Sequence, residues 1–158
     1  MGCGDFVVGS KIRPLCGLYI ACDIVAPLIE YNKNKYQKLN VDFRTLNLNS
    51  DNLPTADVVF IRQVLQHLSN SDIKNIIPKL AQNYKYLVLT EHLPITENFI
   101  HNLDMDTGPN LRLELDSGVV LTSPPFNLEV EDKKIMFEVP LRGGVVTTTI
   151  YKLKTKNK

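Results

Sequence analysis

The sequence predicts an α/β protein, a three-layer α/β/α sandwich whose mostly parallel sheet ends in a C-terminal antiparallel β-hairpin. Short apolar runs alternate with segments of helical periodicity, which is the pattern of parallel strands joined by crossover helices. The end of the chain instead places two strand-like runs around Arg142-Gly143-Gly144, which is typical of a β-hairpin. A length of 158 residues with 44% hydrophobic residues suits one globular domain with a sizeable core.

The first half of the chain is predicted to alternate helices and strands after a glycine turn. Apolar residues at helical spacing predict a first helix whose buried face carries Phe6, Val7, Ile12 and Leu15. The apolar run 18–23 ends in an acid and predicts a strand that is buried on both faces. Residues 26–37 form an amphipathic helix pattern, and the alternating run 41–48 predicts a strand that leads into the turn-rich segment 49–52.

The second half begins with a strand and a helix of the same kind. The helix is predicted over 72–82, with Ser71 or Asn70 as its N-cap. Pro78 falls inside this pattern and should kink or shorten the helix. The strands are predicted from short apolar or β-branched runs at 56–61, 86–90, 135–139 and 145–151.

Charge, cysteine content and hydropathy limit the partners and the compartment. Eighteen basic and 17 acidic residues leave a net charge of +1, whereas nucleic-acid binding needs clustered Lys and Arg, so we expect no nucleic-acid partner. Cys3, Cys16 and Cys22 include no Cys-x-x-Cys pair, which predicts free thiols in a reducing cytoplasm and no metal site. No apolar run approaches the roughly 20 residues of a membrane span, so we expect a cytoplasmic protein without a membrane partner.

The turn at Gly2-Cys3-Gly4 is the first candidate for ligand binding. Glycine lacks the Cβ that would hold a ligand away, so the backbone N–H groups of this turn could approach an anion. Asp23 follows Gly4 by 19 residues and ends the next predicted strand. An acid about 20 residues beyond a glycine turn binds ribose hydroxyls in dinucleotide folds. The two features together predict a nucleotide-cofactor site at the carboxyl edge of the sheet.

Four segments in chain order carry a resemblance to a known family. They are Gly2-Cys3-Gly4-Asp5, Asp23 after a hydrophobic strand, Leu53-Pro54-x-Ala56-Asp57-Val58-Val59-Phe60, and Val64-Leu65-x-His67-Leu68. Together with the terminal hairpin, they resemble the class I S-adenosylmethionine-dependent methyltransferases. The resemblance implies a Rossmann-like fold, S-adenosyl-L-methionine as the cofactor and no metal.

The resemblance also implies roles for the residues of the first two motifs. Gly2, Cys3 and Gly4 would lie beside the amino-acid end of the cofactor. Asp23, with the neighbouring Ile24, would bind the ribose hydroxyls.

Further roles follow from the ends of the next two strands in the family pattern. Asn47 and Leu48 would border the adenine, and Arg62 and Gln63 would face the cofactor and the substrate. The family often has Asp at the position of Asn47, but an amide both donates and accepts hydrogen bonds and can still contact adenine. Phe6 stands where the family commonly has a third glycine of the loop.

Proton removal from the acceptor points to further candidates. A hydroxyl or ammonium acceptor needs a base, and His67 and His92, near the predicted carboxyl ends of strands, are the candidate catalytic residues. Glu91 is the alternative. A structural role stays open for all three, because a histidine can fix a loop by hydrogen bonding and many strands end in polar residues. Arg112 is expected at the surface.

The leading hypothesis is an S-adenosylmethionine-dependent methyltransferase that acts on a small-molecule acceptor, with room for a homo-oligomer. In the family a hydrophobic strand precedes the glycine turn, and here only Met1 precedes it. We therefore expect residues 1–158 to form a single methyltransferase-like domain, truncated at the N-terminus, in which two strands keep unpaired backbone groups. The alternative is an inactive or truncated methyltransferase-like module that acts as a partner subunit. A nicotinamide-dependent oxidoreductase is disfavoured by the absent third glycine and the terminal hairpin.

Overall fold

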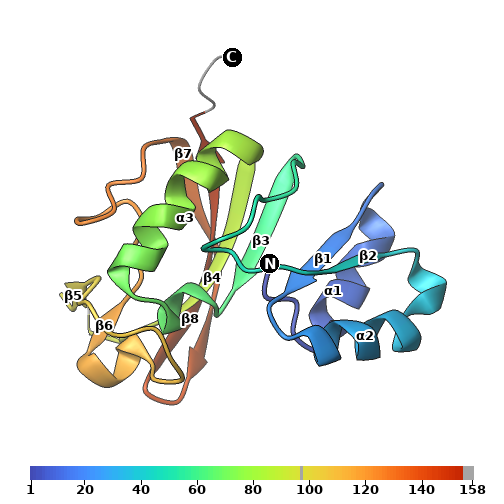
Figure 1. The fold of residues 1–158 in the computed structure, drawn as a ribbon. Helices are drawn as coiled ribbons and strands as arrows, with labels where there is room; N and C mark the ends of the chain where they lie inside the picture. Colours follow the sequence, from blue (N-terminus) through green and yellow to red (C-terminus); the bar gives the residue numbers. More distant parts are fainter. Residues whose placement is uncertain (97, 155–158) are drawn as a thin grey trace. The chain divides into compact units, whose positions relative to one another are not determined.

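Two compact units make up the structure, a computed structural model that describes residues 1–96 and 98–154. The first unit comprises Met1–Pro54 and the second Thr55–Lys158. Each unit contains parallel strands with helices beside them (Figure 1). Within the described residues, no helix combines the length and apolar character that crossing a membrane requires.

The first unit holds two parallel strands and two α-helices. Its elements are α1 (Val7–Ile12), η1 (Arg13–Leu15), β1 (Ile20–Asp23), α2 (Ala26–Lys35), η2 (Gln37–Leu39) and β2 (Asp42–Thr45). Asp23 pairs with Thr45 in the parallel register, so both strands end at the same edge of the small sheet. The core of this unit gathers Phe6, Ala21, Ile29 and Phe43.

The second unit is built on a four-stranded sheet of order β3-β4-β8-β7. Its elements are β3 (Val58–Arg62), η3 (Leu65–His67), α3 (Asn70–Asn83), β4 (Tyr86–Leu93), β5 (Ile100–His101), η4 (Arg112–Leu115), β6 (Ser117–Gly118), β7 (Val130–Leu141) and β8 (Gly144–Leu153). Strand β3 runs parallel to β4, whereas β8 runs antiparallel to both β4 and β7.

One face of the larger sheet is apolar and covered. Alternate side chains of β3 and β4 are fully or almost fully buried, namely Val59, Ile61, Leu87 and Leu89. Helix α3 lies across the sheet (Figure 1) and buries Ile73, Ile76 and Leu80. We infer that the apolar stripe of α3 packs on this face, because both surfaces would otherwise expose large apolar areas.

The predicted elements are present, and several of their details are corrected. The hairpin is confirmed with longer strands than expected. The first helix does not bury the predicted face, because Val7 is 42% and Leu15 is 87% exposed and only Phe6 turns inward. The N-cap of α3 is Ser69, whose Oγ accepts the Asp72 amide, rather than Ser71 or Asn70. That helix is not shortened at Pro78 and continues to Asn83.

The parallel strands fall into separate sheets. Among the described residues, β1 pairs with β2 alone and β3 pairs with β4 alone. The other edge of β1 receives the Cys3 amide at the Cys22 carbonyl, at 2.9 Å. The sequence does not predict the two-residue strands β5 and β6, which form a small parallel pair, because strands this short leave no periodic signal.

Candidate functional site

The glycine turn is fastened to the end of β1 by its own backbone. The Gly4 amide donates to Asp23 Oδ2 at 2.9 Å, and the Gly4 carbonyl accepts Asn32 Nδ2 at 2.7 Å. The amides of Cys3 and Gly4 are therefore satisfied inside the protein. This corrects the expectation that the N–H groups of the turn point at a ligand.

The glycines of the turn contribute an unusual backbone conformation and leave space beside the backbone. Gly2 and Gly4 have φ values of 64° and 53°, a left-handed conformation that glycine adopts without steric cost. A Cβ built on Gly4 would meet no atom of the described residues within 4 Å, so open space lies beside its Cα. A ligand can approach the backbone closely at this point.

Asp23 organises the loop and keeps spare hydrogen-bonding capacity. Its Oδ2 accepts the Gly4 amide and its Oδ1 accepts the Val25 amide at 3.1 Å. A carboxylate offers about four lone-pair positions, so Asp23 can still accept hydroxyl protons from a ribose. Through the bond to the Val25 amide Asp23 also fixes the backbone that follows β1, and this structural role is compatible with ribose binding.

Cys3 lies within the same turn but is not reactive. Burial, followed by the negative charge of Asp23, raises the pKa of the Cys3 thiol to about 11. The thiolate is the nucleophilic form of cysteine, so the side chain stays protonated and inert near neutral pH. Cys3 therefore serves as a packing residue beside the Phe6 cluster.

Residues after β1 and β2 complete one edge of the first unit. Ile24 follows Asp23 directly and is 64% exposed. The Leu46 amide donates to the Asp23 carbonyl at 2.9 Å, which carries the chain from β2 past the end of β1. Asn47 and Leu48 come next, and Asn47 Oδ1 accepts the Asn49 amide. The structure therefore brings Asp23, Ile24, Asn47 and Leu48 to the same edge.

Asn32 is a site residue that the sequence analysis missed. It is fully buried, its Nδ2 donates to the Gly4 carbonyl, and its Oδ1 has no partner among the described residues. The helical spacing could have identified it, because Asn32 follows the buried Ile29 by three positions and thus lies on the core face of α2. A polar residue on a core face is uncommon unless it binds a specific group.

These features fit an adenosyl cofactor. The open space at Gly4 admits close approach, the Asp23 carboxylate can accept hydroxyl protons, and the exposed Ile24 offers an apolar contact. Asn47 can exchange hydrogen bonds with a heterocycle. Among the described residues no group of His, Cys, Asp and Glu is arranged to hold a metal ion.

Arg62 and Gln63 belong to the second unit. Arg62 ends β3 with an exposed side chain. Gln63 has a φ of 52°, and its amide donates to the Thr90 carbonyl at 2.7 Å. A turn therefore redirects the chain directly after β3, and the side chains of both residues are not buried. Their assignment to a cofactor remains a prediction from the resemblance.

Gln66 connects the two histidines that were proposed as bases. Its Oε1 accepts the His92 amide at 3.4 Å, and its Nε2 lies 3.4 Å from His67 Nε2. The Asn110 carbonyl lies 3.2 Å from His67 Nδ1 and can only accept, so Nδ1 carries the proton and Nε2 is the basic atom. Sequence reasoning did not identify Gln66, because glutamine has no signature of its own in a loop.

His92 and Glu91 lie inside β4 and not beyond its end. Adjacent strand residues point to opposite faces of the sheet, so the two side chains are on opposite sides. His92 is 7% exposed, and within the described part of the chain its Nε2 has no hydrogen-bond partner. Glu91 is 2% exposed, and burial raises the pKa of its carboxyl to about 8.

Arg112 is buried and not at the surface as expected. It is fully buried, and its guanidinium donates to the carbonyls of Leu103 and Leu68. It therefore ties two loops together through backbone acceptors. Burial lowers the pKa of Arg112, and the charge of Asp104 opposes this effect.

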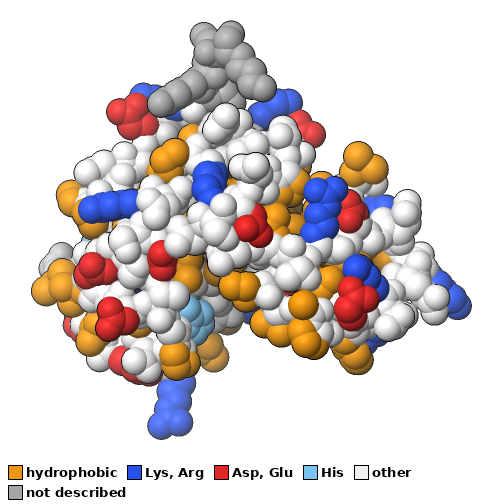
Figure 2. Space-filling view, viewed as in Figure 1, with side chains coloured by type: hydrophobic (Ala, Val, Ile, Leu, Met, Phe, Trp, Pro, Cys, Tyr) orange, Lys and Arg blue, Asp and Glu red, His pale blue; other side chains and the backbone are white. Residues whose placement is uncertain are grey.

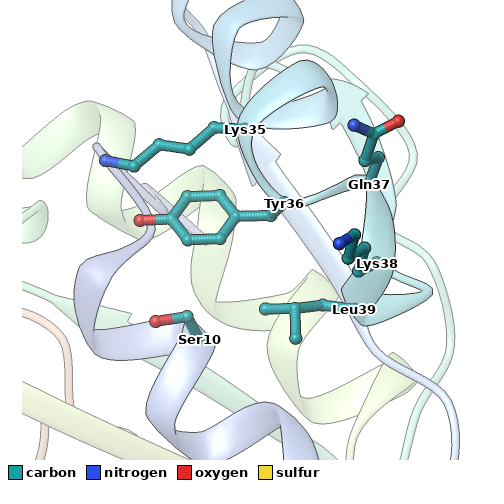
Figure 3. A pocket seen from close by; sticks show the side chains of 6 residues that line it. All are labelled: Ser10, Lys35, Tyr36, Gln37, Lys38 and Leu39. Carbon is teal, nitrogen blue, oxygen red and sulfur yellow. The ribbon is translucent and has the colours of Figure 1, made fainter.

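A hollow of about 510 Å³ lies elsewhere in the first unit (Figure 3). Its walls come from the end of α2, from η2 and from α1, and they are Ser10, Lys35, Tyr36, Gln37, Lys38 and Leu39. Lys35 Nζ stands 5.2 Å from the ring centre of Tyr36. None of the predicted site residues lines this hollow, so it is not the predicted cofactor site.

Comparison with protein families gives a match to a methyltransferase model. Residues 1–85, more than half of the chain, match the family model described as a methyltransferase domain. Methyltransferases of this family use S-adenosyl-L-methionine. Among curated proteins, no match is found.

Solved structures share the fold at low sequence identity. The YcgJ protein from Bacillus subtilis has 20% identity and a TM-score of 0.53, over 61% of this chain and 44% of that one. TehB from Haemophilus influenzae has 14% identity and a TM-score of 0.64, over 97% of this chain and 56% of that one. Magnesium protoporphyrin IX methyltransferase from Synechocystis, with bound SAH, has 14% identity and a TM-score of 0.63, over 97% of this chain and 72% of that one.

These likenesses confirm the Rossmann-like α/β fold that the sequence predicts. The chain spans about half the length of the first two structures, 44% and 56%.

Proposed function

The chain belongs to the family of methyltransferase domains, and on this premise we propose that it transfers a methyl group from S-adenosyl-L-methionine to a small-molecule acceptor. The observation that carries the proposal is the glycine turn, whose Gly4 amide is bound to Asp23 at the end of β1. It combines close backbone access with a carboxylate that suits ribose hydroxyls.

The first unit supplies most of the proposed cofactor contacts. Asp23 accepts the ribose hydroxyls, Gly2, Cys3 and Gly4 give access to the amino-acid end, and Asn47 with Leu48 borders the base. Gly2 and Gly4 have the positive φ values that this turn needs, and Asn32 holds it in place. When bound, the cofactor supplies a methyl group on a positively charged sulfur. The protein's task is then to hold the acceptor in line, which needs no metal.

His67 is the proposed base for an acceptor that must lose a proton. Its Nε2 is the basic atom, because Nδ1 donates to the Asn110 carbonyl. The long 3.4 Å contact to Gln66 leaves that atom weakly engaged. His92 is the second candidate, since its buried Nε2 accepts no hydrogen bond from residues 1–96 or 98–154.

We also propose that the two units belong to one methyltransferase-like domain in the cytoplasm. The support is that the family match over 1–85 continues across the boundary between Pro54 and Thr55. We propose no nucleic-acid partner, because the net charge is +1 and the face in Figure 2 shows basic and acidic side chains interspersed within each unit.

Isothermal titration calorimetry with S-adenosylhomocysteine tests the proposal. The folded wild-type chain should give a saturable heat, and Asp23→Ala should weaken binding about tenfold or more, because a hydrogen bond to a charged group contributes roughly 1.5–3 kcal/mol. Glu30→Ala, an exposed acid in the same unit that pairs with Lys33, should bind like the wild type. No heat with folded protein, together with an NADH fluorescence response, would favour the nicotinamide-dependent alternative.

A second candidate function is that of a methyltransferase-like partner subunit without activity. It is favoured by one observation: in the described residues, β1 and β3 each pair with a single neighbouring strand. Exposed strand edges are templates for pairing with another chain. Under this alternative the cofactor titration gives no heat, and a co-purifying chain instead raises the melting temperature.

A further inference from the structure

A second hollow, of about 380 Å³, lies in the second unit on the face of the sheet that carries Glu91. Strands β4, β8 and β7 form its floor, and the loop at Val119 and Val120 covers one side. Its remaining walls are Leu89, Glu91, Leu93, Lys133, Ile135, Glu138, Thr147, Thr149 and Tyr151. None of the residues proposed for the cofactor lines it, nor does His67 or His92, whereas Glu91, the alternative base, is one of its walls.

Glu91 is buried in this hollow without a hydrogen bond of ordinary geometry. It is only 2% exposed, and among the described residues neither carboxyl oxygen has a partner at hydrogen-bond geometry, although the backbone amides of Leu65, Gln66 and Val64 lie close enough to lower its pKa. A buried polar group without partners costs free energy and is rare in folded proteins. The hollow beside it provides room for a molecule that could donate hydrogen bonds to both oxygens.

Three side chains form a polar row across the floor. Glu91 on β4 is the direct neighbour of Thr147 on β8, and Thr147 is the direct neighbour of Glu138 on β7. The Thr147 hydroxyl donates to Glu138 Oε1 at 3.1 Å. Directly opposed residues of antiparallel strands lie about 4.5–5.5 Å apart at Cα. Two carboxyl groups therefore flank one hydroxyl, with Leu89 and Leu93 as apolar neighbours on β4.

We propose that this hollow binds a small organic cation, an alkylammonium group whose N–H donors satisfy Glu91 while its alkyl chain lies against Leu89, Leu93, Val119 and Val120. The site goes beyond methyl transfer and concerns the second unit alone. An anion is disfavoured by the two carboxyl groups. A neutral alcohol can donate one hydrogen bond and leaves the other oxygen of Glu91 unsatisfied.

The charges around Glu91 fit this assignment. Burial holds its pKa at about 8, opposed by the neighbouring backbone amides of Leu65, Gln66 and Val64 and by the positive charge of Arg112. Lys133, Glu138 and Tyr151 also line the hollow, and Lys133 Nζ is engaged by Thr122 at 3.1 Å. Near neutral pH Glu91 carries a proton, which it releases to solvent when an ammonium ion enters, so an ion pair replaces the neutral carboxyl.

The test uses the full chain, labelled with ¹³C in glutamate, and n-butylammonium chloride as the probe. The Cδ resonance of Glu91 is identified by its loss in Glu91→Gln. We expect saturable binding near pH 7, with the Glu91 signal moving to the carboxylate position. Sodium butyrate should not bind, and 1-butanol should bind more weakly and leave Glu91 protonated.

Two variants and a control locate the effect. Glu91→Gln and Glu138→Gln should weaken butylammonium binding by about tenfold or more, because each removes a charged acceptor. Glu138 is exposed, so its substitution tests the site even if Glu91→Gln destabilises the fold. Glu129→Gln, at an exposed carboxylate paired with Lys154, should leave binding unchanged.

The proposal is overturned if butylammonium does not bind, if 1-butanol binds as tightly, or if the Glu91 signal does not move at saturation. Equal weakening by Glu129→Gln would also overturn it. None of these readouts involves S-adenosylhomocysteine, so they stay separate from the test of methyl transfer.

Discussion

Phe6 holds a backbone conformation that side chains rarely adopt. Its φ is 60°, where a Cβ costs roughly 1–2 kcal/mol. The ring is 1% exposed and makes edge contacts with Tyr19, Tyr36 and Phe43 at centroid distances of 4.9–5.5 Å. Burying such a ring stabilises by about 3–5 kcal/mol relative to alanine, which more than offsets the strain. The position thus keeps the geometry of a loop glycine and uses its side chain as core.

Gly9 is required by the Phe6 ring. A Cβ at Gly9 would clash with Phe6 Cε2, so Gly9→Ala should lower the free energy of unfolding by about 1–3 kcal/mol. In a Phe6→Ala background the clash disappears, and alanine should be favoured in α1 by about 1 kcal/mol. Urea unfolding of the four proteins forms the double-mutant cycle. The same cost of Gly9→Ala in both backgrounds would refute the contact.

Glu91 should make stability depend on pH. Its folded-state pKa of about 8 lies above the ordinary value of 4.5, so the folded protein binds the proton more tightly than the unfolded chain. The stabilisation is complete below pH 4.5 and is lost as pH rises towards 8, with a slope of up to about 1.4 kcal/mol per pH unit. Urea unfolding at several pH values should show this slope in the wild type and not in Glu91→Gln. A slope that persists in the variant would contradict the assignment.

Helix α3 contains a proline that locally destabilises it. Pro78 is the ninth of its 14 residues and is exposed, so the helix lacks the hydrogen bond that an N–H at this position would give to the Lys74 carbonyl. The helix persists because Ile73, Ile76 and Leu80 are fully buried and because Ser69 caps its start. Tertiary packing therefore overrides a local preference.

Replacing this proline should stabilise the protein. We expect Pro78→Ala to raise the free energy of unfolding by up to about 3 kcal/mol, because alanine restores the hydrogen bond and removes the ring clash. Chemical denaturation measures the change, and Lys74→Ala, exposed on the same helix, is the control with little expected effect. A loss of stability in Pro78→Ala would show that the helix depends on the proline.

The strands and helices were predictable where apolar periodicity was strong, as in β1, β3, α3 and the hairpin. The continuation of β4 to Leu93 was not predictable from the sequence. Its last residues include the polar Glu91 and His92, whose burial depends on β8 and on the loop that covers the sheet. Arg112 was misplaced for a similar reason, since its burial relies on carbonyls of Leu68 and Leu103 that are distant in sequence. The 19-residue spacing between Gly4 and Asp23 correctly indicated that the two residues lie together. The glycines alone did not reveal that the amides of the turn donate to groups inside the protein.

The whole molecule is organised as two units, and the family match over residues 1–85 covers the first unit and the start of the second. Residues 1–54 carry the glycine turn, Asp23, Asn47 and Leu48, whereas the second unit carries Arg62, Gln63 and the histidines. Most of the residues proposed for the cofactor thus belong to the first unit, and the proposed bases belong to the second. The central proposal is that the turn at the end of β1 binds the cofactor.

Titration of the ¹⁵N-labelled full chain with S-adenosylhomocysteine, followed by amide NMR, tests this claim most directly. We predict saturable shifts of the Gly4, Ile24 and Leu48 amides, with smaller changes for the residues around the hollow at Lys35 and Leu39. Absence of shifts at Gly4 and Ile24, or shifts centred on the Lys35 hollow, would contradict it.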